Sequence, residues 1–183
     1  MTAIEPPEAT LQPIPATLTA SRIALRILLI LNWIYGAAIL VLLVASIAAK
    51  QQTMTALGVP PAPETEPLIQ GIRAIALLGL VTIPLHYVIL RCLLDLVESV
   101  RLGASFVGEN APRLQRIAWA LLGLQLLSLV IGGIAKGVST AKHPLGVDAG
   151  FSTAGWLAVL LLFVLARVFA EGARMREELE GTV

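Results

Sequence analysis

The sequence is poor in charge. Lys, Arg, Asp and Glu supply 14% of its 183 residues, whereas a soluble globular domain carries about 25%. Hydrophobic residues supply 57% of the chain, and the mean hydropathy is +0.85. So few charged side chains cannot cover a soluble domain of this length. The shortage of charge therefore excludes a soluble globular domain and indicates a protein embedded in a membrane.

Cysteine and histidine are also scarce. The single cysteine, Cys92, excludes an internal disulfide. His86 and His143 are far apart, and no Cys/His cluster has the spacing of a zinc site, so we expect no metal and no cofactor. The net charge of +1 provides no broad basic surface for direct nucleic-acid binding. The chain also has no Ser/His/Asp arrangement, phosphate loop or paired catalytic carboxylates, so we expect that it is not an enzyme.

Long apolar runs are what the sequence has in abundance. A bilayer core of about 30 Å is crossed by about 20 helical residues, and lipid-exposed backbone must satisfy its hydrogen bonds within each helix. Four runs are long enough, at residues 27–49, 74–94, 117–135 and 151–170. The sequence therefore predicts an all-α, polytopic four-transmembrane-helix bundle over residues 22–183, preceded by a flexible cytoplasmic tail at residues 1–21. Cleavage of the first run as a signal peptide is the alternative, although the run is longer than such peptides usually are.

The distribution of Lys and Arg predicts the orientation. The tail, the middle loop and the C-terminal segment carry nine basic residues near the spans, against four on the other side. Because basic residues concentrate on the cytoplasmic side, we expect a multi-pass protein of the inner membrane with both termini in the cytoplasm. The nine are Arg22, Arg26, Arg91, Arg101, Arg113, Arg116, Arg167, Arg174 and Arg176.

Helical periodicity continues past the second and fourth runs. Residues 91–103 keep an apolar stripe, with Arg91 and Asp95 one turn apart, as are Glu98 and Arg101. From Arg167 onward, opposite charges recur at one-turn spacing, with Arg167 near Glu171, Glu171 near Arg174 and Arg174 near Glu178. We therefore expect the second and fourth helices to extend into the cytoplasm. The end of the fourth is either a docking surface or simply a solvated face.

The segment between the second and third runs has the features of a turn before a helix. Asn110 suits a helix N-cap, Pro112 is tolerated only in the first turn, and Glu109 complements the helix dipole. Phe106 is expected to pack beneath this turn. A turn that joins two membrane helices explains all four residues, even if the segment also binds a partner.

Two motifs resemble a known family. Gly103, Phe106, the run from Glu109 to Ala111, Arg113, Leu114 and Ile117 match G-x-x-F-x-x-E-N-A-x-R-L-x-x-I. This pattern is similar to that of domain-of-unknown-function family 2975, which consists of small bacterial four-helix membrane proteins. The ending of the chain is similar to F-x-x-G-x-x-L-x-x-D-x-x-x-T-V, with Met175 in place of Leu and Glu178 in place of Asp. The resemblance covers residues 22–183 and brings no catalytic chemistry. It implies that the gene lies beside that of a small helix-turn-helix regulator, as in many members.

Polar residues inside the runs are the remaining candidates, because such residues are costly in a bilayer. Arg91 and Asp95 either tie spans together or extend toward the headgroups. His86 is either a proton relay or ligand, or a hydrogen-bonded structural residue. Asn32 and Gln125 are expected to bond to neighbouring helices, and the alternative is a small polar cavity.

The sequence favours a non-enzymatic membrane regulator or sensor that binds a cytoplasmic partner, such as a helix-turn-helix regulator. A homo-oligomer and membrane lipid are the other partners considered. The alternative is a small transporter or channel-like subunit, but the runs lack mid-depth carboxylates and an internal repeat. The residues expected to contact the partner are Phe106, Glu109, Asn110, Arg113, Arg116, Glu171, Arg174 and Glu178.

Overall fold

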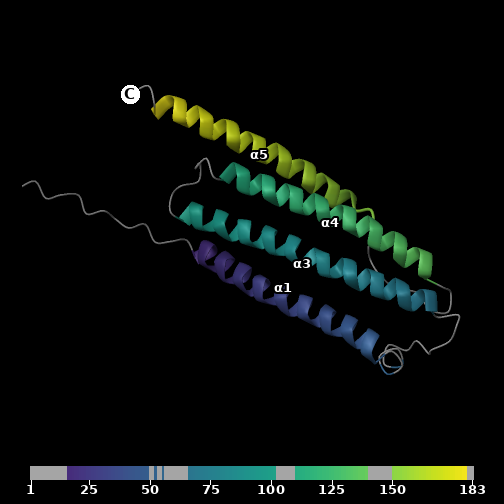
Figure 1. The fold of residues 1–183 in the computed structure, drawn as a ribbon. Coiled ribbons are helices and arrows are strands. Elements are labelled where there is room, and N and C mark those ends of the chain that lie inside the picture. The colour runs from purple at the N-terminus through teal and green to yellow at the C-terminus, as the bar shows by residue number, and fades with distance from the viewer. Residues whose placement is uncertain are drawn as a thin grey trace, which may run out of the picture.

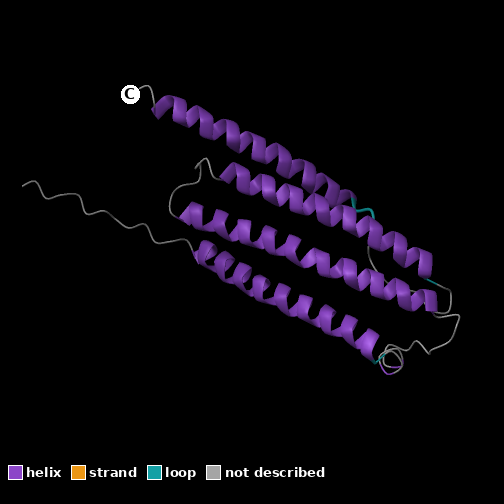
Figure 2. Cartoon of the chain, viewed as in Figure 1, coloured by secondary structure: helices purple, strands orange, loops and turns teal. Residues whose placement is uncertain are grey.

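The computed structural model describes residues 16–49, 52, 55, 66–101, 110–139 and 150–180. Four long helices occupy almost all of these ranges, and no strand occurs among them, which confirms the all-α class (Figures 1 and 2). The helices are α1 (Ala16–Ala48), α3 (Glu66–Arg101), α4 (Asn110–Val138) and α5 (Thr153–Glu180). At about 1.5 Å per residue they are roughly 42 to 54 Å long, so each exceeds the thickness of a bilayer core.

Each helix contains more residues than the apolar run that predicted it. The continuation of the second and fourth helices is observed, because α3 reaches Arg101 and α5 reaches Glu180. Residues 16–21, predicted as part of the tail, belong to α1. Residues 1–15 of that tail, and Gly103 with the rest of the turn up to Glu109, lie outside the described residues.

The helices pack in chain order as an open row. Helix α1 contacts α3, α3 contacts α4, and α4 contacts α5, while α1 and α5 have no contact with each other (Figure 1). Successive helices run in opposite directions. The start of α1 and the end of α5 therefore lie at one end of the row, here called the termini end. The other end, where α1 ends and α5 begins, is here called the far end.

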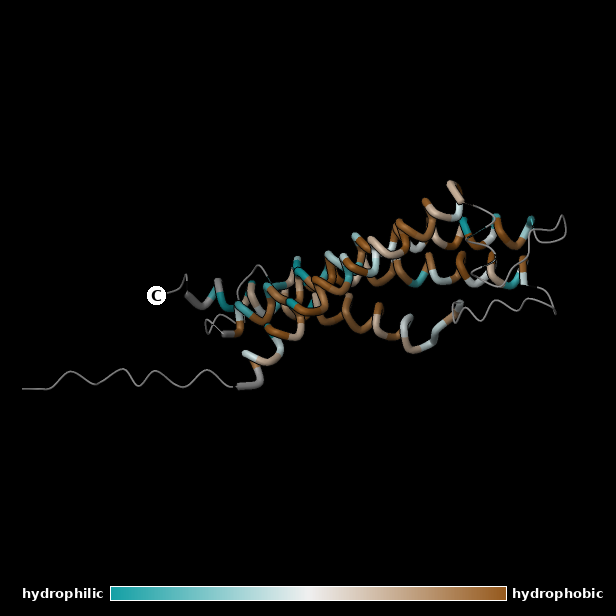
Figure 3. Tube along the Cα trace, turned by 90° about the horizontal axis from the view of Figure 1, so that it is seen from below, coloured by the Kyte–Doolittle hydropathy of each residue, from teal (hydrophilic) through white to brown (hydrophobic). Residues whose placement is uncertain are grey.

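Large apolar side chains cover the outside of the row. Figure 3 shows hydrophobic residues along all four helices. Many of them are exposed, among them Trp33, Ile34 and Leu161. All four helices are long and apolar enough to cross a membrane. Because such a surface is stable only in contact with hydrocarbon, the fold fits a multi-pass membrane protein.

Small residues allow the neighbouring helices to approach closely. At Gly71 of α3, a Cβ atom would lie 2.6 Å from Cγ2 of Val138 in α4. At Gly36 of α1, it would lie 3.2 Å from the side chain of Ile83 in α3. Packing of this kind takes the place of a hydrophobic driving force between helices that are already surrounded by lipid.

Candidate functional site

A buried polar cluster closes the turn between α3 and α4. It consists of Ser99, Asn110 and Arg113, and we call it the Asn110 cluster. The Asn110 side chain is 0% exposed, and its Oδ1 accepts hydrogen bonds from Ser99 Oγ at 3.2 Å and from Arg113 Nη1 at 3.0 Å. A buried polar group without partners costs about 1–3 kcal/mol, so these bonds fix how the end of α3 meets the start of α4.

The residues of the predicted loop motif therefore differ in their exposure to solvent. Asn110 faces the interior, Arg113 is half-buried beside it, and Arg116 is exposed one turn further along α4. Phe106 and Glu109 lie outside the described residues. The sequence analysis did not single out Ser99. Ser99 follows the buried Cys92 by seven residues, and small residues at heptad spacing are typical of a helix interface.

The end of α5 carries two of the three charge pairs that the sequence predicted, whereas Arg167 and Glu171 do not pair. Arg174 lies between two glutamates, with Nη2 2.9 Å from Glu171 Oε1 and Nε 3.4 Å from Glu178 Oε1. The side chains of Arg174 and Glu178 are largely exposed, that of Glu171 is about half exposed, and Met175 beside them is exposed as well. We call residues 171–178 the α5 tip. It presents paired charges around an apolar side chain.

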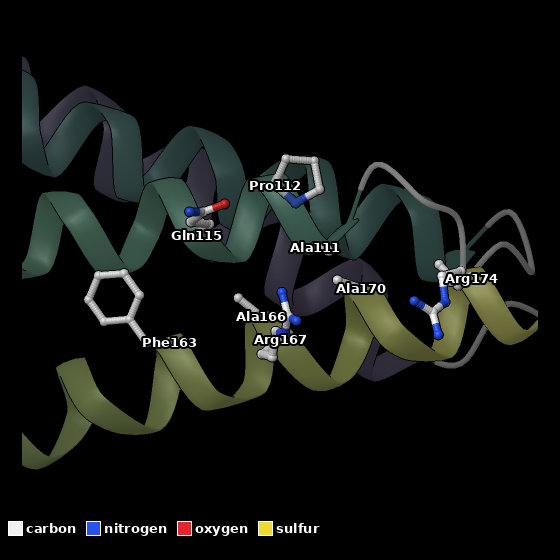
Figure 4. Close-up of a pocket in the computed structure, with 9 residues that line it drawn as sticks. Ala111, Pro112, Gln115, Phe163, Ala166, Arg167, Ala170 and Arg174 are labelled. Carbon is white, nitrogen blue, oxygen red and sulfur yellow. The ribbon is translucent and has the colours of Figure 1, made fainter.

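A groove of about 520 Å³ separates the first turns of α4 from the last turns of α5 (Figure 4). Arg167 reaches from α5 toward α4 within this groove, and we call it the Arg167 groove. Its lining consists of Ala111, Pro112, Gln115, Phe163, Ala166, Arg167, Ala170, Ala173 and Arg174.

Sequence reasoning did not predict the Arg167 groove. The signal was the spacing of Ala166, Ala170 and Ala173, which places three small side chains on one face of α5. Two of these alanines are buried against α4, while Arg167 next to them is exposed. Small side chains at this spacing leave room beside an arginine that the sequence places in an apolar run.

Two ion pairs lie elsewhere at the termini end. Arg22 of α1 lies with its Nε 3.6 Å from Glu98 Oε2 of α3, so Glu98 joins two helices. The sequence had predicted Glu98 to pair with Arg101, whose side chain lies outside the described residues. Arg91 and Asp95 pair within α3 at 4.0 Å, with both side chains about half exposed. Neither member of this second pair is buried between helices.

The polar residues at membrane depth mostly bind backbone. Asn32 donates from Nδ2 to the carbonyl of Ile83 at 3.2 Å, which joins α1 to α3 as predicted. His86 Nδ1 lies 2.9 Å from the carbonyl of Thr82, so the ring is bound within its own helix. Asn32, His86 and Tyr35 also line a mostly apolar groove of about 340 Å³ between α1 and α3.

Gln125 and Ser128 of α4 both face α5 and the residues that precede it. A Cβ atom at Gly155 would lie 2.0 Å from Gln125 Nε2, so the glutamine packs directly on the α5 backbone. Ser128 Oγ donates to the Gly150 carbonyl at 3.2 Å and accepts from the Gly150 N–H at 3.1 Å. Because α1 and α4 do not touch, the cavity considered for Asn32 and Gln125 does not form within the described helices.

At the far end, Arg73 of α3 binds the last turn of α1. Its Nε donates to Ser46 Oγ at 3.3 Å, and its Nη2 donates to the Ser46 carbonyl. The last four carbonyls of a helix lack partners inside it, and a cation near them also complements the helix dipole. Sequence reasoning used Arg73 only to assign orientation, because nothing in the sequence says which helix end it meets.

Comparison with known proteins identifies the chain at the level of a family. Among the described residues, no group of three His, Cys, Asp or Glu side chains could hold a metal ion. Neither the curated proteins nor the solved structures contain a match. The profile described as "Protein of unknown function (DUF2975)" matches residues 28–183, which is most of the chain. This protein therefore belongs to the DUF2975 family.

Proposed function

We propose that this protein is a non-enzymatic membrane regulator that binds a soluble partner at the termini end of its helix row. The observation that carries the proposal is the α5 tip. The first turn of α4 and residues 170–174 of α5 line the Arg167 groove together, so they lie at the same height along the row. The end of α5 therefore extends beyond the start of α4 (Figure 1). Its paired charges and exposed Met175 offer both electrostatic and apolar contact to a protein.

The orientation is part of the proposal. An even number of crossings leaves both termini on one side of the membrane. The predominance of arginine at the termini end favours the cytoplasm as that side. In a bacterial cell this corresponds to the inner membrane, with the α5 tip and Arg116 facing the cytoplasmic proteins.

The proposed partner is the small helix-turn-helix regulator encoded next to many members of this family. Charge pairs at the rim of such a contact chiefly set the association rate and the specificity. Holding the regulator at the membrane would keep it from DNA, and a change in the helix row would release it. The protein itself would act without a catalytic step.

No contact among the described helices favours the transporter alternative. Helix α1 touches only α3, and α5 touches only α4, so the row of described helices does not close around a path. A polar pathway would require several copies of the chain.

Binding of the purified neighbouring regulator to the detergent-solubilised full chain tests the proposal. The variant carries Arg174→Ala and Glu178→Ala, because Asn110 is buried and its replacement would disturb the fold. We expect the affinity to fall about tenfold, which corresponds to roughly 1.4 kcal/mol. The matched control, Arg91→Ala with Asp95→Ala, removes another solvent-accessible i,i+4 pair, from α3, and should bind as the wild type does. Absence of wild-type binding even at low salt refutes the proposal.

A further inference from the structure

The Arg167 groove contains a guanidinium without a protein partner. Within the part of the chain that the structure describes, Arg167 makes no ion pair and no hydrogen bond, and its side chain is exposed. Arg174 at the other end of the groove is paired with both Glu171 and Glu178. Of the two arginines that line the groove, Arg167 is therefore the one whose guanidinium is not in contact with a carboxylate of the described residues.

The position of Arg167 along α5 places this charge within reach of lipid. The helix begins at Thr153 and has no charged residue before Arg167, an uncharged length of about 21 Å. This is shorter than a bilayer core of about 30 Å. At the opposite end of α5, Trp156 stacks on Phe151 with ring centroids 6.3 Å apart, and tryptophan is enriched at membrane interfaces. When these rings lie at one interface, Arg167 lies about 9 Å inside the other, where a bare cation is costly.

We propose that the Arg167 groove binds an anionic glycerophospholipid, whose phosphate pairs with the Arg167 guanidinium. The exposed amide of Gln115, which lines the groove from α4, lies where it can donate to the same headgroup. Toward the bilayer centre the groove is lined by Phe163, whose ring packs edge-on against Trp119 at 5.2 Å. An acyl chain lies along this apolar part while the headgroup occupies the charged part.

Charge selects the lipid class. The unpaired Arg167 guanidinium is matched by the phosphate of an anionic headgroup such as phosphatidylglycerol, which carries no cation of its own. A zwitterionic headgroup carries a cation that offsets its own phosphate, so its net attraction to Arg167 is weaker. This site is separate from the α5 tip and does not depend on the identity of a protein partner.

Native mass spectrometry of the detergent-solubilised full chain measures the retained lipid directly. Phosphatidylglycerol and phosphatidylcholine with the same acyl chains are added in separate experiments. We expect the wild type to retain phosphatidylglycerol in preference, and Arg167→Gln to reduce that retention about fivefold. The matched control is Arg176→Gln, which removes the same charge from α5 outside the groove and should retain lipid as the wild type does.

A second variant tests the groove without changing its charge. Ala170 lines the groove and is exposed, so Ala170→Leu fills the space while the helix packing is kept. We expect it to lose phosphatidylglycerol to a similar extent as Arg167→Gln. Equal retention by Arg167→Gln and the wild type overturns the proposal, as does equal retention of the two lipids. Displacement of the lipid by inorganic phosphate also overturns it, because the site would then bind a free anion.

Discussion

The two ends of the helix row use polar residues differently. At the far end, Arg73 and Ser128 bind backbone groups of the neighbouring element, and Gly71 sits tightly against Val138. At the termini end, the Asn110 cluster is buried in the same manner, but Arg167 and the α5 tip are left exposed. Polar groups at the far end thus join neighbouring elements. The termini end combines two structural contacts, the Asn110 cluster and the Arg22–Glu98 pair, with charged side chains that are exposed.

This difference assigns stability and binding to separate residues. A change at the far end should alter the free energy of unfolding and leave partner or lipid binding intact. A change in the exposed charges of the termini end should do the reverse, because exposed ion pairs contribute little to stability. The Asn110 cluster tests the comparison most directly, since it lies at the termini end, as the interhelical Arg22–Glu98 pair does, but is fully buried.

Gly71→Ala should have the largest effect on stability. Its Cβ would lie 2.6 Å from Cγ2 and 3.0 Å from Cβ of Val138, and a short β-branched side chain cannot turn away. We expect a loss of about 3 kcal/mol in the free energy of unfolding, measured by chemical denaturation in detergent. Gly133→Ala is the matched control, because a Cβ there meets nothing within 4 Å, and it should be neutral or slightly stabilising. Equal stability of the two variants would mean that α3 and α4 do not pack this closely.

Asn110→Ala should come next. The substitution removes the buried acceptor that Ser99 and Arg113 share, at a cost of about 1–2 kcal/mol, because the Ser99 hydroxyl keeps its bond to the Leu96 carbonyl at 2.8 Å. The loss should appear in the same denaturation experiment, with Gln115→Ala as a control on an exposed amide of the same helix. An unchanged stability would show that the α3–α4 turn does not depend on its buried amide.

Arg73→Met should have a smaller effect. The methionine keeps an apolar stem against α1 but removes the donor to the Ser46 carbonyl and the charge at the helix end. We expect a loss of about 1 kcal/mol. Lys136→Met, which removes an exposed cation from the last turn of α4, should cost less. If both substitutions cost the same, the Arg73 contact adds nothing beyond a general charge effect.

Most of the secondary structure could be predicted because it depends on local sequence. Only long apolar helices can cross a bilayer, so the four apolar runs located the four helices. Helix α4 begins at Asn110, the residue that was expected to cap it. The pairs of Arg174 could also be predicted, since residues three and four apart on a helix are always neighbours.

The contacts between helices could not be predicted, and the physical reason is the membrane itself. In a soluble helix, an apolar stripe marks the face that packs inward. Here the lipid-facing and protein-facing sides are both apolar, so no stripe revealed that Ser99 would meet Asn110 or that Arg73 would meet Ser46. The Arg167 groove was missed for the same reason, because it depends on which face of α5 packs against α4.

Glu178→Gln should have the smallest effect on stability. The pair with Arg174 is exposed on both sides, with the two side chains 65% and 67% accessible, so its loss should cost about 0.3 kcal/mol. A double-mutant cycle with Arg174→Gln in low and high salt measures this coupling. If the coupling exceeds about 1 kcal/mol, the α5 tip is a stabilising element like those of the far end. A small, salt-sensitive value instead means that a partner can replace this pair at little cost to the fold, which is what the contrast between the two ends requires.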